Sequence, residues 1–162
     1  MELVDTTEGI RVGEAKYGKG VYATRSFAAE QVVGQVQGHV MDDPDYYSEY
    51  CIDLYEHYSL EPVAPFRYVN HSCLPNCQFV QYDVEDEGKV VGAEIWLETL
   101  RPIAENEQLT IDYAWPASGA ILCECGSDNC RGWIVSEEEL DQLPIVVDDD
   151  SEIPEAAAVS AV

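Results

Sequence analysis

Basic residues are scarce in this chain. Of its 162 residues only 8 are Lys or Arg, against 32 Asp or Glu, so the formal net charge is −24. Binding through the phosphate backbone of DNA or RNA needs clustered Lys and Arg, and we therefore expect no direct nucleic-acid binding. An anionic membrane surface would repel the chain for the same reason. The charge favours a cationic partner or substrate, although solubility or adaptation to high salt explains it equally well.

Long apolar runs are also missing. No stretch approaches the ~20 apolar residues of a membrane-spanning helix. The N-terminus has no basic start followed by an apolar run, so we expect no signal peptide. These absences predict an intracellular protein, cytoplasmic if the host is prokaryotic and nuclear if it is eukaryotic or viral.

What the chain does contain predicts a mainly β domain. A hydrophobic fraction of 46% is enough for one real core. Apolar–polar alternation rich in β-branched residues predicts strands at residues 32–40, 78–84, 89–97 and 108–113, with turn residues between them. We expect one short helix around residues 46–50. A capping box at residues 136–139 predicts one or two further helical turns before Pro144.

The cysteines predict a metal site. Cys123, Cys125 and Cys130 form a C-x-C-x4-C pattern in a polar, glycine-containing loop, which is poor core material. Structural zinc prefers four tetrahedral ligands, so a fourth thiolate must come from elsewhere in the chain. Cys73 and Cys77, in a polar stretch upstream, are the candidates. Six cysteines in an intracellular protein favour metal ligands or buried thiols over disulfides.

A glycine-rich segment, Gly18-Lys19-Gly20-Val21-Tyr22-Ala23, superficially matches a dinucleotide-binding fingerprint. That fingerprint has meaning only between a buried strand and a helix, and here it follows a polar stretch. We therefore reject a dinucleotide site and expect a tight hairpin turn, with bare backbone that a ligand can approach.

Four motifs, in this order, resemble those of the SET-domain protein-lysine methyltransferases that carry a C-terminal post-SET zinc segment. They are the glycine motif at 18–23, an RFINHSCxPN-like motif at 67–77, an ELTxDY-like motif at 107–113 and a CxCGxxxCRG-like motif at 123–133. The resemblance covers about residues 9–135. Asn106 replaces a glycine common in the third motif, but Asn tolerates a left-handed turn.

The resemblance implies a fold of small curved β-sheets with a pseudoknot, in which the Asn70 and Tyr113 segments thread past each other. It also implies a SET catalytic domain at residues 1–116 and a post-SET zinc segment at 117–135. The shift to an acidic composition after that predicts a flexible tail at 136–162.

The resemblance further implies roles for individual residues. Tyr113 would be the catalytic residue. The S-adenosylmethionine contacts would be Gly18, Lys19, Gly20, Tyr50, Asn70, His71 and Trp133, with His71 supporting cofactor and scaffold rather than acting as a base. The structural zinc ligands would be Cys73, Cys123, Cys125 and Cys130. Phe79 and Ile111 would line the substrate-lysine pocket.

The implied activity is methyl transfer to the ε-amine of lysine in a basic protein, which could be a histone, histone-like or ribosomal protein. Six acids and five tyrosines interleave between residues 42 and 58. We call this segment the tyrosine–acid band; it suits a basic peptide through ion pairs and cation–π contacts, or is simply an amphipathic segment. Two alternative functions stay open: a catalytically silent SET-like module that binds a basic peptide, and a small structural zinc protein.

Overall fold

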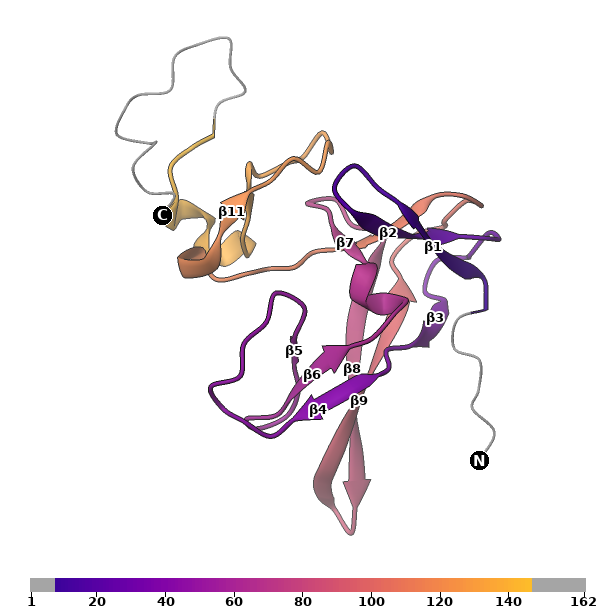
Figure 1. The fold of residues 1–162 in the computed structure, drawn as a ribbon, viewed down its shortest axis with the longest axis vertical. Helices are drawn as coiled ribbons and strands as arrows, with labels where there is room; N and C mark the ends of the chain where they lie inside the picture. The colour runs from indigo at the N-terminus through magenta and orange to yellow at the C-terminus, as the bar shows by residue number, and fades with distance from the viewer. Residues whose placement is uncertain (1–7, 147–162) are drawn as a thin grey trace. The chain divides into compact units, whose positions relative to one another are not determined.

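The computed structural model describes residues 8–146, which form short strands and 3₁₀ turns with no α-helix among them (Figure 1). The strands are β1 (Ile10–Glu14), β2 (Lys19–Ala23), β3 (Val32–Gln35), β4 (Gly38–Met41), β5 (Ile52–Asp53), β6 (Ser59–Pro62), β7 (Asn70–His71), β8 (Cys77–Asp86), β9 (Lys89–Thr99), β10 (Gln108–Ile111), β11 (Ile121–Leu122) and β12 (Trp133–Ile134). The 3₁₀ turns are η1 (Phe66–Tyr68), η2 (Ala117–Gly119) and η3 (Glu137–Gln142). Within this range no helix has the length and apolar character needed to cross a membrane.

The chain divides into two compact units. The first unit comprises residues 1–70 and 75–111, and the second comprises residues 71–74 together with 112–162. Residues 71–74 thus group with a segment far along the chain rather than with their own neighbours, the kind of crossing that a pseudoknot requires. The mainly β prediction is confirmed. The part boundaries at 116 and 135 stay predictions, and residues 147–162 of the tail lie outside the described residues.

The first unit contains three small sheets, with strand orders β1-β2-β10-β7, β3-β9-β8 and β4-β6-β5. Its core is made by alternate residues of these strands: Val21 on β2, Leu97 on β9 and Leu109 on β10 are all fully buried. Each such side chain contributes about 1.5–3 kcal/mol when removed from water. In the described part of the second unit, Val135 is the one buried apolar side chain. The two units are therefore stabilised by different interactions.

The predicted strands at 78–84 and 89–97 are confirmed as β8 and β9, and the strand at 108–113 as β10, which ends at Ile111. The strand predicted at 32–40 is instead two strands in different sheets. β3 pairs with β9, whereas Gly38 begins β4, which pairs with β6. A Cβ at Gly38 would overlap the Glu61 carbonyl oxygen, so a glycine is required for this close strand approach.

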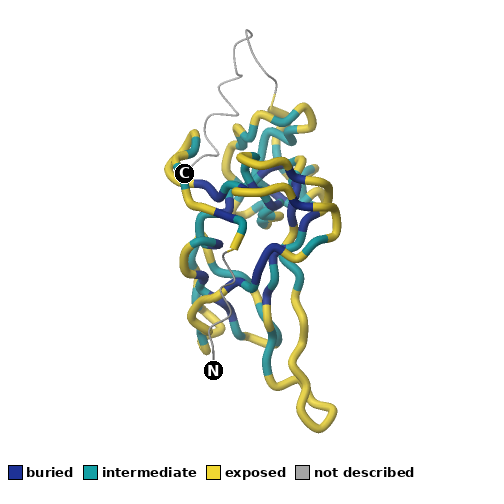
Figure 2. Tube along the Cα trace, turned by 90° about the vertical axis from the view of Figure 1, so that its right-hand side faces the viewer, coloured by how far each residue is buried: buried dark blue, intermediate teal, exposed yellow. Residues whose placement is uncertain are grey.

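Strands β8 and β9 form a long hairpin that extends past the strands around it (Figure 1). Its turn residues Glu87 and Gly88 both have positive φ, at +48° and +77°, as in the tight turns that suit twisted hairpins. β3 pairs with β9 from Val32 to Gln35 only, at the base of the hairpin. Residues 81–91 are exposed, so the distal hairpin is a two-stranded ribbon in solvent (Figure 2).

The helix predicted around residues 46–50 is wrong, since this segment consists of turns. The Ser48 hydroxyl accepts hydrogen bonds from the backbone N–H groups of Tyr50 and Cys51. Asp43 does the same for Asp45. Such local bonds give the backbone an alternative to a helical ladder, and they prevail here.

The helical turns predicted before Pro144 are present as η3, a 3₁₀ rather than an α-helix, with Ser136 at its N-cap position. The reciprocal side-chain bonds of a capping box do not form. Ser136 makes no side-chain cap hydrogen bond, and the Glu139 carboxylate accepts the backbone N–H of Ala117 instead. A tertiary contact to η2 thus replaces the local cap.

Asn76 fastens β10 to the segment before β8. Its side-chain nitrogen donates to the Gln108 carbonyl at 2.8 Å, and its side-chain oxygen accepts the Thr110 N–H at 2.8 Å. Asn76 is 2% exposed, so water cannot replace these bonds. The sequence motif around Asn76 gives no indication of this scaffold role.

We expect Asn76→Ala to lower the free energy of unfolding by about 2–4 kcal/mol, because it leaves buried backbone groups of β10 unpaired. Urea denaturation of the two proteins measures this directly. The control is Gln78→Ala, an exposed position on β8 whose effect should stay within about 0.5 kcal/mol. A loss of unfolding free energy below about 1 kcal/mol for Asn76→Ala would contradict the role of Asn76 in holding β10 to the segment before β8.

Candidate functional site

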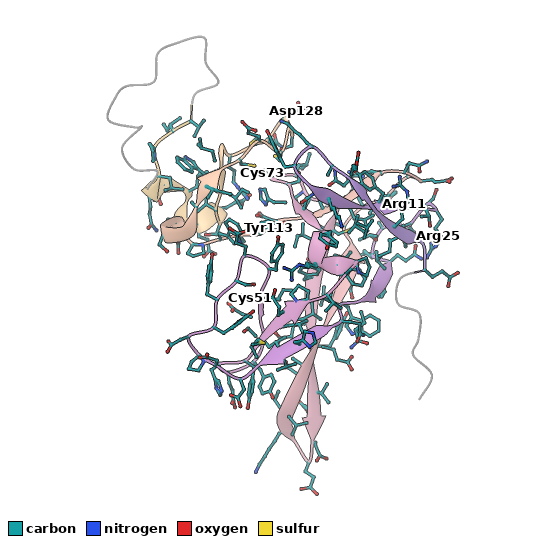
Figure 3. The ribbon with its side chains drawn as sticks, viewed as in Figure 1. Arg11, Arg25, Cys51, Cys73, Tyr113 and Asp128 are labelled. Atoms are coloured by element: carbon teal, nitrogen blue, oxygen red, sulfur yellow. The ribbon has the colours of Figure 1, made fainter. Side chains whose placement is uncertain are left out.

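Four cysteine sulfurs converge in the second unit. The Sγ atoms of Cys73, Cys123, Cys125 and Cys130 all lie within 4.8 Å of one another, and Cys73 is labelled in Figure 3. The choice between Cys73 and Cys77 is thereby resolved. Cys77 is buried in the first unit, where burial raises the pKa of its thiol to about 12, and it belongs to no such cluster among the described residues.

The donor set fits zinc. Tetrahedral coordination with Zn–S bonds of about 2.3 Å places sulfurs about 3.8 Å apart, and the Sγ atoms of Cys73 and Cys123 are 3.7 Å apart. Burial raises the pKa of both these thiols, so a cation is needed to hold them as thiolates at neutral pH. Three cysteines on one loop and one from a distant segment are also typical of a closed, structural site.

Hydrogen-bond donors surround the sulfurs. The backbone N–H of Arg131 points to Cys73 Sγ at 3.4 Å, and that of Gly132 to Cys130 Sγ at 3.4 Å. The Ser127 hydroxyl lies 3.2 Å from Cys125 Sγ. Burial alone would raise the pKa of Cys125, but the Ser127 bonds outweigh it and bring the pKa to about 6. The loop is thus arranged to stabilise negative charge on sulfur.

His71 joins this cluster to Tyr113 in its neutral form. Its side chain is 3% exposed, and burial lowers its pKa to about 4 despite the nearby Asp112 carboxylate. Nδ1 accepts the Tyr113 backbone N–H at 3.1 Å, so the proton resides on Nε2, which lies 3.3 Å from Cys73 Sγ. Asp112 Oδ1, 3.6 Å from Nδ1, therefore makes no ion pair with His71.

Tyr113, labelled in Figure 3, lies two residues after the end of β10 and is half-buried between two rings. Its ring centroid lies 5.4 Å from that of His71 and 5.3 Å from that of Trp115, with which it is stacked. Sequence reasoning missed Trp115. The sequence signal for Trp115 is that it lies two residues after Tyr113. In the structure Ala114, between them, has a left-handed φ of +47°, which turns the chain back.

Arg131 and Asp112 form a second feature that sequence reasoning missed. The Arg131 guanidinium donates from both terminal nitrogens to both Asp112 oxygens, each at 2.7 Å. The Arg131 side chain is 7% exposed. Such two-point pairing fixes the orientation of both groups as well as their separation.

The glycine motif forms the tight β1–β2 hairpin turn, as expected. Gly18 has φ of +75°, and nothing lies within 4 Å of where a Cβ would be, so bare backbone faces open space there. The side-chain nitrogen of Asn70 donates to the Lys19 carbonyl and to Gln108 Oε1, both at 2.9 Å. Asn106 has φ of +68°, the left-handed turn expected of the residue that replaces glycine.

Tyr50 is held by a polar cluster in the first unit. Its ring lies under the Arg67 guanidinium at 3.9 Å, and Arg67 pairs with Glu61 at 2.9 Å. Glu61 also accepts hydrogen bonds from the Ser48 and Tyr46 hydroxyls. These bonds, led by that from Ser48, hold the pKa of Glu61 below its ordinary 4.5 against the effect of burial.

The remaining predicted site residues lie on strands β8, β10 and β12. Trp133 lies on β12, half-buried, with its Nε1–H donating to the Pro144 carbonyl at 2.8 Å. Phe79 is half-buried on β8, and Ile111, at the end of β10, is 7% exposed. A cofactor contact for Trp133 and a pocket role for Phe79 and Ile111 stay predictions.

The tyrosine–acid band, around β5, is largely exposed. All six of its acids are exposed, and so are two of its five tyrosines, Tyr47 at 75% and Tyr50 at 41%. The other three tyrosines are half-buried. Asp42 pairs with His57 at 2.7 Å. The band thus offers carboxylates together with accessible rings rather than acids alone.

Comparisons with known proteins agree on one family. The model of the SET domain matches residues 18–114. The chain is 40% identical over 67 residues to the histone-lysine N-methyltransferase SETD1 of Drosophila melanogaster, which is 41% of this chain and 4% of that protein. It is 39% identical over 69 residues to the histone-lysine N-methyltransferase ASHR3 of Arabidopsis thaliana, 42% of this chain and 13% of that protein. The chain thus spans a small fraction of these relatives.

Solved structures share the fold. KRYPTONITE in complex with mCHG DNA and SAH superposes with a TM-score of 0.64 at 24% identity, covering 75% of this chain and 27% of that one. KRYPTONITE with mCHH DNA, an H3(1–15) peptide and SAH gives 0.64 at 23% identity, covering 77% and 29%. The prediction of the SET fold is confirmed by these similarities.

We expect the purified protein to hold about one zinc ion per chain and Cys73→Ser to weaken zinc affinity by at least about 100-fold, since even second-shell changes cost 10–100-fold. Metal analysis and chelator competition measure this. Cys51→Ser is the matched control, because this cysteine lies outside the cluster. Unchanged zinc affinity in Cys73→Ser would overturn the assignment.

A pH-dependent contribution is expected from Glu61. Because its pKa is lowered in the folded protein, the carboxylate stabilises the fold above its ordinary pKa of 4.5, and this contribution disappears as pH falls through the lower folded value. Glu61→Gln should therefore be less stable than wild type by about 1–3 kcal/mol at pH 7, with the difference shrinking at acidic pH. Denaturant unfolding at several pH values checks this, and a constant difference would refute it.

Proposed function

Because the chain belongs to the SET-domain family, we propose that it transfers a methyl group from S-adenosylmethionine to the ε-amine of a lysine in a basic protein. The single observation that carries the proposal is the placement of Tyr113. It lies at the end of the third SET motif, with its backbone bonded to the neutral His71 of the second motif. Residues of the second and third motifs thus contact each other at the position where the family carries its catalytic tyrosine.

The cofactor contacts follow from the family match and are supported by local geometry. Gly18 offers its backbone next to open space at a tight turn, and Lys19 and Gly20 follow it on β2, where Gly20 packs against Gln108. Asn70 has its side-chain nitrogen committed to two acceptors, which orients its carboxamide. Tyr50 is fixed by stacking under Arg67. SAH in the solved KRYPTONITE structures supports the choice of S-adenosylmethionine as the methyl source.

The proposed reaction is a direct displacement. The lone pair of the neutral lysine amine forms the new N–CH₃ bond while the S–CH₃ bond breaks and its electron pair returns to sulfur, leaving a thioether and an ammonium that then loses a proton. No covalent enzyme intermediate is needed, so the rate enhancement comes from positioning and electrostatics. Tyr113 is proposed to orient the amine and the methyl group through its hydroxyl.

Zinc is proposed to be structural. The four thiolates leave no open coordination position, so the metal would act by ordering the second unit rather than by binding substrate. Cys73 is two residues from His71, and Cys130 is adjacent to Arg131. Metal binding would therefore order the same short segments that hold Tyr113.

The substrate is proposed to be a basic protein, with the tyrosine–acid band as its docking surface. Six exposed carboxylates and the exposed rings of Tyr47 and Tyr50 suit ion pairs and cation–π contacts with Lys and Arg. The H3(1–15) peptide in one KRYPTONITE structure supports a basic peptide as the class of ligand. We do not extend the DNA of that structure to this chain, because its net charge of −24 opposes phosphate binding.

We expect Tyr113→Phe to reduce methyl transfer by about 10²–10³-fold while leaving the affinity for S-adenosylmethionine within a few-fold, because a transition-state hydrogen bond is removed and the ring is retained. The assay is transfer of labelled methyl groups to histones and ribosomal proteins, with an acidic protein as negative substrate. Cofactor binding is measured separately by calorimetry.

Tyr82→Phe is the matched control, since Tyr82 lies on the exposed hairpin and should retain full activity. Cofactor binding without transfer to any basic protein would favour a silent peptide-binding module. Absence of both cofactor binding and transfer would leave a structural zinc protein.

A further inference from the structure

Arg131 stands between the cysteine cluster and the segment that carries Tyr113. By its position in the chain it directly follows Cys130, and its backbone N–H lies 3.4 Å from Cys73 Sγ. Its side chain extends to Asp112, the residue before Tyr113, and donates to both carboxylate oxygens at 2.7 Å. Arg131 therefore contacts the cysteine cluster through its backbone and the residue before Tyr113 through its side chain.

The Arg131 side chain is largely buried, at 7% exposed, and its partner Asp112 is part-buried, at 29%, so retaining the pair has a cost. Removing a guanidinium and a carboxylate from water carries a large desolvation penalty, repaid only by good geometry and further hydrogen bonds. Here the geometry is good, but Arg131 Nε is buried and has no hydrogen-bond partner within residues 8–146. An apolar pair of similar size would contribute comparable stability. An apolar pair would lack the fixed orientation that two parallel hydrogen bonds between a guanidinium and a carboxylate impose.

Asp112 transmits that orientation to the backbone around Tyr113. Oδ1, which accepts one of the Arg131 bonds, also accepts the backbone N–H of Ala114 at 3.0 Å. The intervening N–H, that of Tyr113, is bonded to His71 at 3.1 Å. The peptide groups on both sides of Tyr113 are thus fixed, one through Arg131 and the other through His71.

We propose that Arg131 is a positioning residue which couples the cysteine cluster to the orientation of Tyr113 through Asp112. This inference rests on the proposed function for the role of Tyr113, but the coupling itself is a structural property. Cys73, Cys123, Cys125 and Cys130 would hold the metal, which would order Cys130 and with it Arg131, while Asp112 holds the Tyr113 backbone in place. A merely structural ion pair would affect stability without this specific link.

Three variants of the full chain test the link. Arg131→Met removes the charge at similar volume. Arg131→Lys retains the charge but not the two-point hydrogen bonding of the guanidinium. Asp112→Asn removes the charge of the partner. All three retain the four cysteines and the Arg131 backbone N–H. Arg25→Met, an arginine of the first unit whose guanidinium lies over Phe27, is the matched control.

The first readout is hydrogen exchange at the Tyr113 amide, measured with and without zinc, and it requires no turnover. In wild type, zinc removal should speed exchange, and Arg131→Met should speed it in the zinc-loaded protein while β8–β9 amides stay protected. In Arg131→Met the effect of zinc on this amide should be reduced at least about tenfold, the scale of second-shell losses.

The second readout is the kinetic split. We expect Arg131→Met and Asp112→Asn to lower kcat by roughly 10–100-fold with KM nearly unchanged, the cost of misplacing a group by about 1 Å. Arg131→Lys should recover part of the loss.

Wild-type exchange and kcat in Arg131→Met would overturn the proposal, as would a loss in Arg25→Met of the same size. If Arg131→Met fails to fold, Arg131→Lys and Asp112→Asn decide by the same measurements. If wild type shows no methyl transfer, the proposed function fails, while the exchange measurement still judges the coupling.

Discussion

A unit that buries a single apolar side chain must be held together by something other than the hydrophobic effect. Among the described residues of the second unit, Val135 alone is a buried apolar residue. Small units with so little core usually need a metal or covalent links. This unit has instead four converging sulfurs, backbone N–H groups that point at them, and one part-buried Arg–Asp pair. Tyr113 belongs to this unit, so its geometry depends on directional polar contacts to its backbone together with the rings of His71 and Trp115, rather than on an apolar core.

His71 shows why that dependence suits the proposed methyl transfer. A protonated imidazole would place a cation beside an aromatic ring and a sulfur cluster, and it would have no lone pair for the Tyr113 N–H. Burial keeps the imidazole neutral, so one nitrogen accepts from the Tyr113 backbone and the other faces Cys73. The proposed catalytic tyrosine and the proposed metal ligand Cys73 are thus separated by one ring whose tautomer is determined by its neighbours.

Much of the fold and the cysteine cluster could be predicted from the sequence, because alternation and spacing are local signals. The strands at 78–84, 89–97 and 108–113 and the turn at Asn106 are examples. The helix expected at residues 46–50 is replaced by local side-chain hydrogen bonds, and the other predictions fail where distant groups decide the structure. Residues 32–40 divide because Gly38 pairs with β6, and Glu139 leaves its capping box for Ala117. The roles of Asn76, Arg131 and Asp112 were not predicted, because the local sequence does not show which distant backbone group or side chain a polar residue will bind.

The exposed β8–β9 ribbon gives the acidity of the chain one more consequence. No described strand pairs with the outer edges of the distal ribbon, although the Val91 carbonyl accepts a hydrogen bond from the Tyr55 hydroxyl. These edges are therefore a template on which a second copy could add a strand. Asp83, Glu85 and Asp86 line one of these strands, and a copy that approaches in antiparallel register brings the same charges with it. Mutual repulsion between carboxylates therefore protects the ribbon from intermolecular pairing. Strong acid or high salt removes that protection, so the colloidal behaviour of the protein depends on the same charge that is proposed to attract its substrate.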